Sequence, residues 1–436
     1  MRVLGNNTRY RRGSRTVIRY QSTVEFSEII FSFRCAFSKR SWPYLGAMAG
    51  SWLIASGQRH IRRLCVRASW KRHESSYYRF LSHFKFRREV FFKALLNLAI
   101  TVFGQKELLL VVDDTLCPKW GKHIFGTGTF FDHVRRPRPG YIWGHNWVVL
   151  AMVVHLFGVP VALPFWISLY RPQNTCSKDA FRTKLQLVVE ALQIIRGWTS
   201  LPISLVADGA FNNKSLLKPL AKMNLPMVSR LRFDARLRRD PPQRRPRRRG
   251  RPAQYGRWLA KLQALARAGR GWDIVQAHIY GKDVTLKVKS FEAWWPKAGV
   301  KLRVVIVRDP SGKRKPCYLS STDSSLTPIA IIERFALRWT IEQLFSDAKL
   351  LMGLDSAEVR SEKSVVRHAI FTFALVTCVR VWAQKHFATY ATPPVSFAGQ
   401  LSELRGEVMR QTIFLSSVGC KLSKRNSDAL ARLAVA

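Results

Sequence analysis

The stretch Leu108–Thr115, LLLVVDDT, is a run of five apolar residues that ends in two adjacent acids. Residues Pro202–Ala210, PISLVADGA, show the same pattern, with Asp208 after another apolar run. Short apolar runs are typical of buried strands, and open α/β sheets bind their ligands beyond strand ends. A carboxylate buried there costs free energy unless a cation or another partner compensates its charge. Both stretches therefore predict buried strands that bring acids to one edge of a sheet.

Segments around these two runs alternate between strand and helix patterns. Residues Trp147–Tyr170 are apolar enough to resemble a membrane helix, but FGVP at 157–160 is a turn signal, so we expect two buried strands joined by a hairpin. SKDAFRTKLQLVVEALQII at 177–195 predicts a helix with Ser177 as its N-cap, and a helix at 212–223 and a strand at 226–231 follow. This alternation indicates an α/β layer structure.

The later part of the chain contains a basic segment, a β-rich region and two helices. Residues 234–252 include nine arginines, and we expect them to be a mobile linker or loop that does not enter a core. Four strand patterns follow between residues 271 and 322. A long helix is expected from Thr327 as N-cap and Pro328 as first helical residue through 354, and a last apolar helix over 364–385.

The N-terminal region is basic. Residues 1–24 hold six arginines and no acid, which fits an organelle transit peptide, or a flexible arm that contacts phosphates, which we favour. Between Ser22 and Ile100 apolar residues recur at helical spacing, with basic and aromatic side chains between them. The pattern predicts either a helical DNA-binding unit or an ordinary helical bundle with a basic surface.

Composition narrows the choice of partner. The chain has 436 residues, a net charge of +46, an apolar fraction of 47% and seven scattered cysteines without a zinc-like spacing. Such a charge favours a polyanionic partner, and nucleic acid fits best because each cation placed on a phosphate releases counterions. The apolar fraction excludes a disordered basic protein, and the cysteine pattern favours reduced thiols in the cytoplasm. An RNA-binding or packaging protein shares the charge but would lack a set of acids.

The long helix supplies a third acid. Phe335, Arg338, Glu342 and Lys349 fall on one stripe at helical spacing, where the acid could hold a metal and the cations could hold phosphates. An exposed helix with an ion pair four residues apart is the alternative. Magnesium prefers carboxylate oxygens, and two such ions can activate an attacking oxygen and stabilise a leaving one.

These motifs resemble those of a known family. FALRWTIEQLFSDAK resembles the Tyr-(2)-Arg-(3)-Glu-(6)-Lys signature of bacterial insertion-sequence transposases of the DDE type, with Phe335 in place of the Tyr. VVDDTLCPKWGKH resembles the strand of the family's first aspartate, with its Asp-x-Thr step, and LVADGAFNN that of the second. The resemblance covers roughly residues 108–354.

The resemblance implies a ribonuclease-H-like α/β core interrupted by a β-rich insertion, with an all-α N-terminal domain. Asp113, Asp208 and Glu342 would be catalytic and bind two Mg²⁺ or Mn²⁺ ions, with Asp114 as the less favoured alternative to Asp113. The implied or candidate DNA contacts are Arg338, Lys349, Lys119, His123, Trp294 and Trp295. For Lys119 and His123 the alternative is an ordinary surface loop, and for the two tryptophans it is core packing rather than base stacking.

The resemblance also implies the function. We expect a bacterial transposase, cytoplasmic and associated with the nucleoid, that cleaves and joins double-stranded DNA and forms a homodimer on it; the alternative is a catalytically silent DNA-binding descendant. The expected segments are a basic arm (1–24), a helical DNA-binding domain (25–104), the first part of the core (105–233), the basic linker and β-rich insertion (234–325), the second part of the core (326–390) and a C-terminal tail (391–436).

Overall fold

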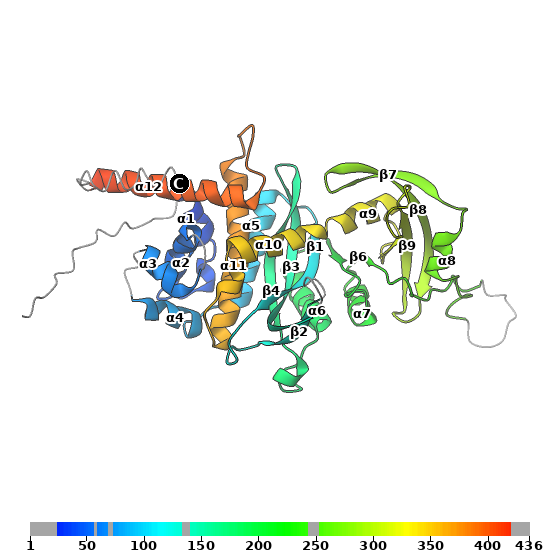
Figure 1. The fold of residues 1–436 in the computed structure, drawn as a ribbon, viewed down its shortest axis with the longest axis horizontal. Helices are drawn as coiled ribbons and strands as arrows, with labels where there is room; N and C mark the ends of the chain where they lie inside the picture. The colour runs from blue at the N-terminus through cyan, green and yellow to red at the C-terminus, as the bar shows by residue number, and fades with distance from the viewer. Residues whose placement is uncertain (1–23, 56–58, 69–72, 133–139, 243–252, 420–436) are drawn as a thin grey trace, which may run out of the picture.

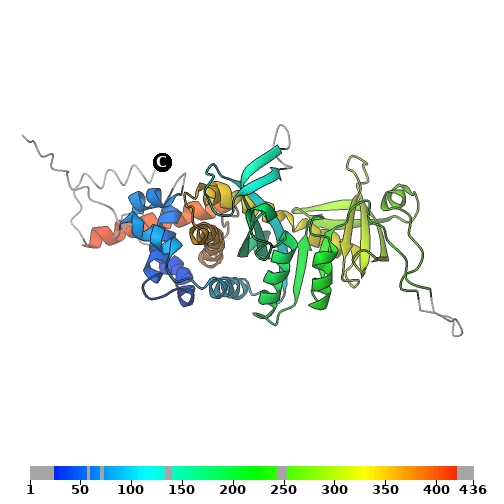
Figure 2. The ribbon, with the colours of Figure 1, turned by 90° about the horizontal axis from the view of Figure 1, so that it is seen from below.

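The computed structural model describes residues 24–55, 59–68, 73–132, 140–242 and 253–419. The arm at 1–24, apart from its last residue, and the arginines at 244–251 lie outside the described residues. Figures 1 and 2 show an elongated molecule, with helices α1–α4 at one end, the central strands in the middle and strands β7–β9 at the other end. The N-terminal helices are α1 (Val24–Phe31), α2 (Trp42–Ile54), α3 (Ile61–Ala68), α4 (Glu74–Ser82) and α5 (Arg88–Phe103).

Five strands form the central part of one mixed sheet. They are β1 (Leu108–Pro118), β3 (Gly140–Leu156), β4 (Val159–Tyr170), β5 (Ile203–Ala207) and β6 (Met227–Arg230). Their order is β4-β3-β1-β5-β6, in which β3 is antiparallel to β1 and β4, and β5 and β6 run parallel to β1. This order and these directions confirm the expected ribonuclease-H-like core. A short strand, β2 (Gly128–Asp132), pairs with the start of β3.

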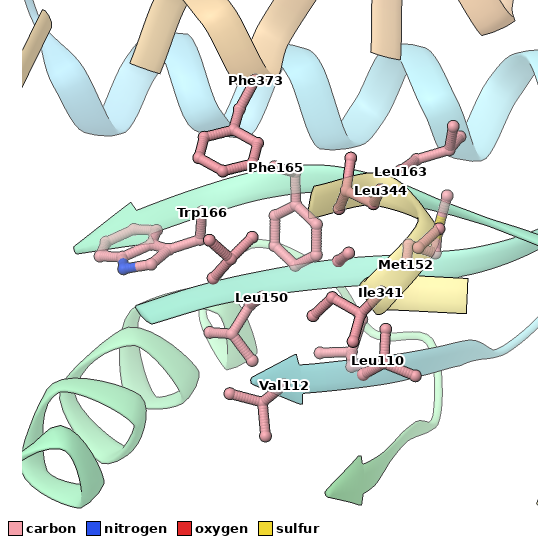
Figure 3. Close-up of a cluster of buried hydrophobic side chains, with 14 of the residues drawn as sticks. Leu110, Val112, Leu150, Met152, Leu163, Phe165, Trp166, Ile341, Leu344 and Phe373 are labelled. Atoms are coloured by element: carbon pink, nitrogen blue, oxygen red, sulfur yellow. The ribbon is translucent and has the colours of Figure 1, made fainter. Parts of the chain in front are cut away.

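The apolar run at 147–170 forms the predicted hairpin. Strands β3 and β4 are joined at Phe157 and Gly158, which both have positive φ, at 52° and 79°. Two consecutive residues with positive φ match the twist of a tight hairpin connection. Side chains of β1, β3 and β4 here meet those of helices α10 (Trp339–Ser346) and α11 (Glu362–His386), as Figure 3 shows.

The β-rich insertion continues the same sheet. Its strands are β7 (Asp273–Ile279), β8 (Lys282–Trp295), β9 (Val300–Arg308) and β10 (Cys317–Ser321), preceded by α8 (Leu262–Arg267). Strand β10 pairs antiparallel with β6, and β9, β8 and β7 follow in order, which gives a sheet of ten strands. The insertion is therefore tied by backbone hydrogen bonds to the strand that follows β5.

The basic segment at 234–252 was expected to stay out of the core, and for its first residues that prediction is wrong. Leu237 is buried, and the backbone of Arg238 pairs with that of Trp294 on β8. The guanidinium of Arg238 lies 4.1 Å from the ring centroid of Trp258. An apolar side chain and backbone pairing attach this part of the segment to the insertion, whatever its charge.

Two helices join the central strands. In α6 (Lys184–Arg196) the N-cap is Thr183, whose hydroxyl accepts from the Gln186 amide and completes a capping box, so the expected cap at Ser177 is wrong. Helix α7 (Lys214–Lys222) begins after Asn213, which caps it through the Ser215 amide. In this box the Thr183 hydroxyl accepts from the Gln186 amide and the Gln186 side chain accepts from the Thr183 amide, so the pair satisfies two free amides, which Ser177 is too far from the helix start to do.

The long helix expected from 327 is interrupted. Thr327 caps α9 (Pro328–Ala336) as predicted, but α9 ends at Ala336 and a separate helix, α10, starts at Trp339. The Thr340 hydroxyl donates to the Leu337 carbonyl, and the amides of Thr340 and Ile341 bond three residues back instead of four. A π-helical turn at Asp347–Leu351 then follows α10. Because of these irregular turns, the side chains after Ala336 do not point in the directions that one continuous helix would give them.

The last expected helix is confirmed as α11. It is long and apolar enough to cross a membrane by length and composition, but 94% of its apolar window is buried inside the protein, as in a core helix. It packs against β4, α1, α4 and α5. Beyond it, the segment expected to be a tail contains helix α12 (Phe397–Gly419), which packs against α2 and α11.

Candidate active site

The sheet places the first two acids side by side. The parallel register pairs Val112 of β1 with Ala207 of β5. Asp113 is the next residue of β1, which continues to Pro118 beside β3, and Asp208 directly follows β5, so the two acids lie side by side where the parallel pairing of these strands ends. The carboxyl ends of parallel strands are where such sheets bind ligands.

Arg338 connects the acids of the strands to the acid of α10. Its guanidinium lies 3.0 Å from Asp113 Oδ2 and 2.7 Å from Glu342 Oε1, at the junction where α9 ends. Burial lowers the pKa of this guanidinium, but Glu342, Asp113 and Asp208 raise it above its ordinary value. All three predicted acids therefore act electrostatically on one arginine.

The environment of Asp113 disfavours its charge. The pKa of this carboxyl is raised to about 7, chiefly by burial and also by the neighbouring charges of Asp114 and Asp208, while a hydrogen bond from the Asp114 amide and the charge of Arg338 act to lower it. A carboxyl whose pKa is raised by burial and by like charges is typical of a functional site.

Asp114 has a different partner. Side chains alternate along a strand, and the Asp114 carboxylate pairs with Lys184 of α6, at 2.7 Å, instead of with Arg338. Its own backbone amide donates to Asp113 Oδ1, at 2.9 Å. This placement favours Asp113 as the member of the acidic set.

Two lysines from the predicted site tie β1 to the segment after α10. Lys349 donates to the Leu116 carbonyl at 2.7 Å, and the buried Lys119 donates to the Asp355 carbonyl at 2.8 Å. Burial lowers the pKa of the Lys119 ammonium. These bonds hold the strand of Asp113 against the segment that follows the helix of Glu342, so both lysines have a structural role in addition to any contact with phosphate.

The other predicted DNA contacts lie on other parts of the fold. Trp295 is buried, which favours core packing for its ring, whereas Trp294 is half-buried and donates from Nε1 to Asp240 Oδ1 at 2.8 Å. His123 is exposed on the loop after β1, beside Trp120, whose side chain is 96% exposed. The phenyl ring of Phe335 lies 6.0 Å from the Arg338 guanidinium.

A match to a family model shows the family to which this chain belongs. Residues 33–271, more than half of the chain, match the family model described as DDE superfamily endonuclease. The chain belongs to this family. The matched region contains Asp113 and Asp208 but ends before Glu342. The assignment of Glu342 as the third acid of this DDE endonuclease is therefore based on its contact with Arg338.

Two solved structures are similar in part. One is described as a cryo-EM structure of piggyBac transposase synaptic complex with hairpin DNA; it shares 10% identity and a TM-score of 0.46, over 97% of this chain and 82% of that one. The NurA nuclease from Sulfolobus solfataricus shares 11% identity and a TM-score of 0.23, over 56% of this chain and 79% of that one. No curated protein matches.

Endonucleases of the DDE superfamily generally use divalent metal ions. Among the residues that the structure describes, no three His, Cys, Asp or Glu side chains are close enough together to hold one. The donors nevertheless fit in chemistry and charge, because carboxylate oxygens are the ligands that hard cations prefer and the pKa of Asp113, raised chiefly by burial, is raised also by the negative charges of Asp114 and Asp208. In this arrangement the Arg338 guanidinium is the cation that the acids contact.

Proposed function

We propose that this DDE endonuclease is a bacterial DNA transposase of the Tyr-Arg-Glu-Lys group, which binds the ends of its element, cleaves the strands and joins them to target DNA. Asp113, Asp208 and Glu342 would hold two Mg²⁺ or Mn²⁺ ions. The observation that carries the proposal is the convergence of the three acids: Arg338 bonds to both Asp113 and Glu342, and the parallel register of β1 and β5 places Asp208 beside Asp113.

In the proposed reaction, water attacks a phosphodiester phosphorus and the bond to the 3′ oxygen breaks, which leaves a 3′ hydroxyl and a 5′ phosphate. That hydroxyl then attacks a phosphodiester of target DNA and displaces its 3′ oxygen. Bound ions would activate the attacking oxygen and stabilise the leaving one. The residues of the chain position the acids: β1 and β5 place Asp113 and Asp208 in register, and Lys349 holds β1 to the segment after α10.

Arg338 would have two successive partners. Without metal it pairs with Asp113 and Glu342. When cations balance the acids, its planar guanidinium can turn to a phosphate of the DNA end, for which bidentate geometry suits it. This role agrees with the raised pKa of Arg338, which keeps it charged throughout.

The wider assignments belong to the same proposal. The charge of +46 supports binding to double-stranded DNA at the element ends and at the target, and a nucleoid-associated place in the cytoplasm. Joining two ends requires them to be held together, which a homodimer on DNA would do. The helical region at 25–104 would read the repeats, with the alternative that its basic surface is only a solvated face.

The proposal is tested by a Mg²⁺-dependent cleavage assay on DNA that flanks the protein's own gene. We expect Asp208→Asn and Glu342→Gln to abolish cleavage and to leave duplex binding within about two-fold. Glu190→Gln, which removes a surface carboxylate paired with Arg182, is the matched control and should cleave normally. Cleavage at the wild-type rate by either site variant would refute the assignment.

The second candidate is a catalytically silent DNA-binding protein. The position of Arg338 favours it, because this guanidinium bonds to both Asp113 and Glu342 and a metal ion would have to displace it. In that case the wild-type chain would bind the flanking duplex and not cleave it with Mg²⁺ or Mn²⁺.

A further inference from the structure

A large basic cavity opens beside the acidic edge. It has a volume of about 1030 Å³, and Asp208 forms part of its wall. Three parts of the fold enclose it: the end of β6 with the residues after it, helix α8, and the connection from β9 to β10. Because β6 is the sheet neighbour of β5, the cavity continues the edge that carries Asp113 and Asp208 into the insertion.

The wall of the cavity carries seven cationic side chains and one acid, Asp208. The cations are Arg230, Arg232, Arg267, Arg308, Lys313, Arg314 and Lys315. Within the described part of the chain only one of the seven, Arg232, has an ion pair, with the exposed Asp234. Such a concentration of unneutralised cations around a hollow raises the local concentration of a polyanion.

Phe233 adds an apolar surface to this basic wall. Its side chain is 56% exposed, although it follows the buried Leu231 by only two residues. An exposed aromatic ring among arginines is the combination that binds single-stranded nucleic acid, since bases stack on the ring while cations follow the backbone. The hydroxyl-bearing ring of Tyr318 lies largely buried in the same wall.

We infer that this cavity, defined by α8, the end of β6 and the β9–β10 connection, binds a single DNA strand next to the scissile phosphate, with Phe233 stacked on a base. The inference rests on the proposed function for the adjacent Asp208. The volume is slightly above the range of about 300–1,000 Å³ that is typical of ligand pockets, which suits a few nucleotides of one strand.

The test measures binding without cleavage, by fluorescence anisotropy of the full chain in a chelator. One probe is a blunt duplex, and the other is the same duplex with a single-stranded extension. For the triple variant Arg267→Gln/Arg308→Gln/Arg314→Gln we expect binding of the extended probe to weaken about 10- to 100-fold. The slope of log K against log[salt] should become shallower by up to about two, because up to three phosphate contacts are lost. Binding of the blunt duplex should change less than about two-fold.

A matched variant controls for net charge. Lys214→Gln/Lys222→Gln/Lys282→Gln removes the same charge from exposed positions outside the cavity, and we expect both probes to bind it almost as they bind the wild type. Phe233→Ala should weaken binding of the extended probe by roughly 5- to 100-fold, which is the effect of losing one stacked base. Phe233→Tyr keeps an aromatic ring and should bind the extended probe as the wild type does.

Equal losses in the cavity variant and the charge control, or equal losses for blunt and extended DNA, would overturn the inference. Competition by inorganic pyrophosphate as effective as that by an oligonucleotide, compared per phosphate, would also overturn it, since the cavity would then bind phosphate and not a strand. The proposed function can fail separately, because binding of the two probes can be measured even if the protein never cleaves DNA. If the wild type cleaves DNA but the cavity variant binds the extended probe as the wild type does, only the inference about the cavity is refuted.

Discussion

Replacing Arg338 by Met tests whether this guanidinium occupies the place of a cation among the acids. The change removes its bonds to Asp113 and Glu342, of 3.0 and 2.7 Å, and keeps most of the side-chain volume. Breaking a buried ion pair costs about 3–5 kcal/mol, and because these carboxylates are 20% and 35% exposed we expect about 2–4 kcal/mol. The measurement belongs at pH 8, where Asp113, with a pKa of about 7, is charged.

Thermal unfolding in a chelator and with Mg²⁺ separates the two effects of the substitution. At about 2–4 °C per kcal/mol for a domain of 150–250 residues, the variant should unfold roughly 5–15 °C below the wild type in the chelator. A bound ion at 100 times its Kd stabilises by about 2.7 kcal/mol, so Mg²⁺ should narrow this difference. Binding is easier in the variant because no guanidinium has to leave the carboxylates.

Lys184→Met is the control, because it breaks the pair with Asp114, at 2.7 Å, which faces α6. Its deficit should be the same with and without Mg²⁺. If the Arg338→Met deficit is also unchanged by Mg²⁺, or if this variant is as stable as the wild type in the chelator, the interpretation of Arg338 as the cation among the acids is wrong.

Three further predictions concern single residues. Asp113→Asn should lose cleavage by at least about 100-fold while Asp114→Asn keeps most of it, and the reverse result in the flanking-DNA assay would exchange their roles. Lys349→Met loses its bond to the Leu116 carbonyl, at 2.7 Å; we expect cleavage to fall more steeply than duplex binding, and an unchanged rate would argue against the tether. His368 is buried against Trp52, and burial lowers its pKa to about 3. The unfolded chain therefore takes up a proton below about pH 6.5 that the folded protein does not, and stability should fall by up to about 1.4 kcal/mol per pH unit from there towards pH 3. In His368→Phe, acid unfolding should depend less steeply on pH; an identical pH dependence by circular dichroism would contradict this.

The elements of the core could be predicted because their signals are local. An apolar run that ends in acids predicted β1 and β5, and the turn at Phe157 and Gly158 separated β3 from β4. The insertion strands were visible as runs between turns, and Thr327 capped its helix as expected. Burial of apolar side chains at strand or helix spacing depends on the residues of one segment, and the sequence holds all of that information.

Two of the errors come from local hydrogen bonds that replace the expected ones, and one comes from packing against distant residues. The capping box at Thr183 replaced the expected cap at Ser177, and the helix expected from 327 to 354 breaks before α10. Leu237 enters the core although it belongs to an arginine-rich segment. In each case a hydrogen bond or a packing contact outweighs the propensity of the segment.

The sequence by itself determined the types of residue at the candidate site: two aspartates after apolar runs and a glutamate four residues after an arginine. Only the tertiary structure decided their relations. The parallel register of β1 and β5 placed Asp113 beside Asp208, and the direction of each side chain gave Asp113 to Arg338 and Asp114 to Lys184. The basic cavity likewise exists only after β10 pairs with β6, which brings cations from residues 230 to 315 to one hollow. Spacing along a chain defines faces of single elements, whereas charge balance and cavities depend on how elements far apart in sequence are brought together.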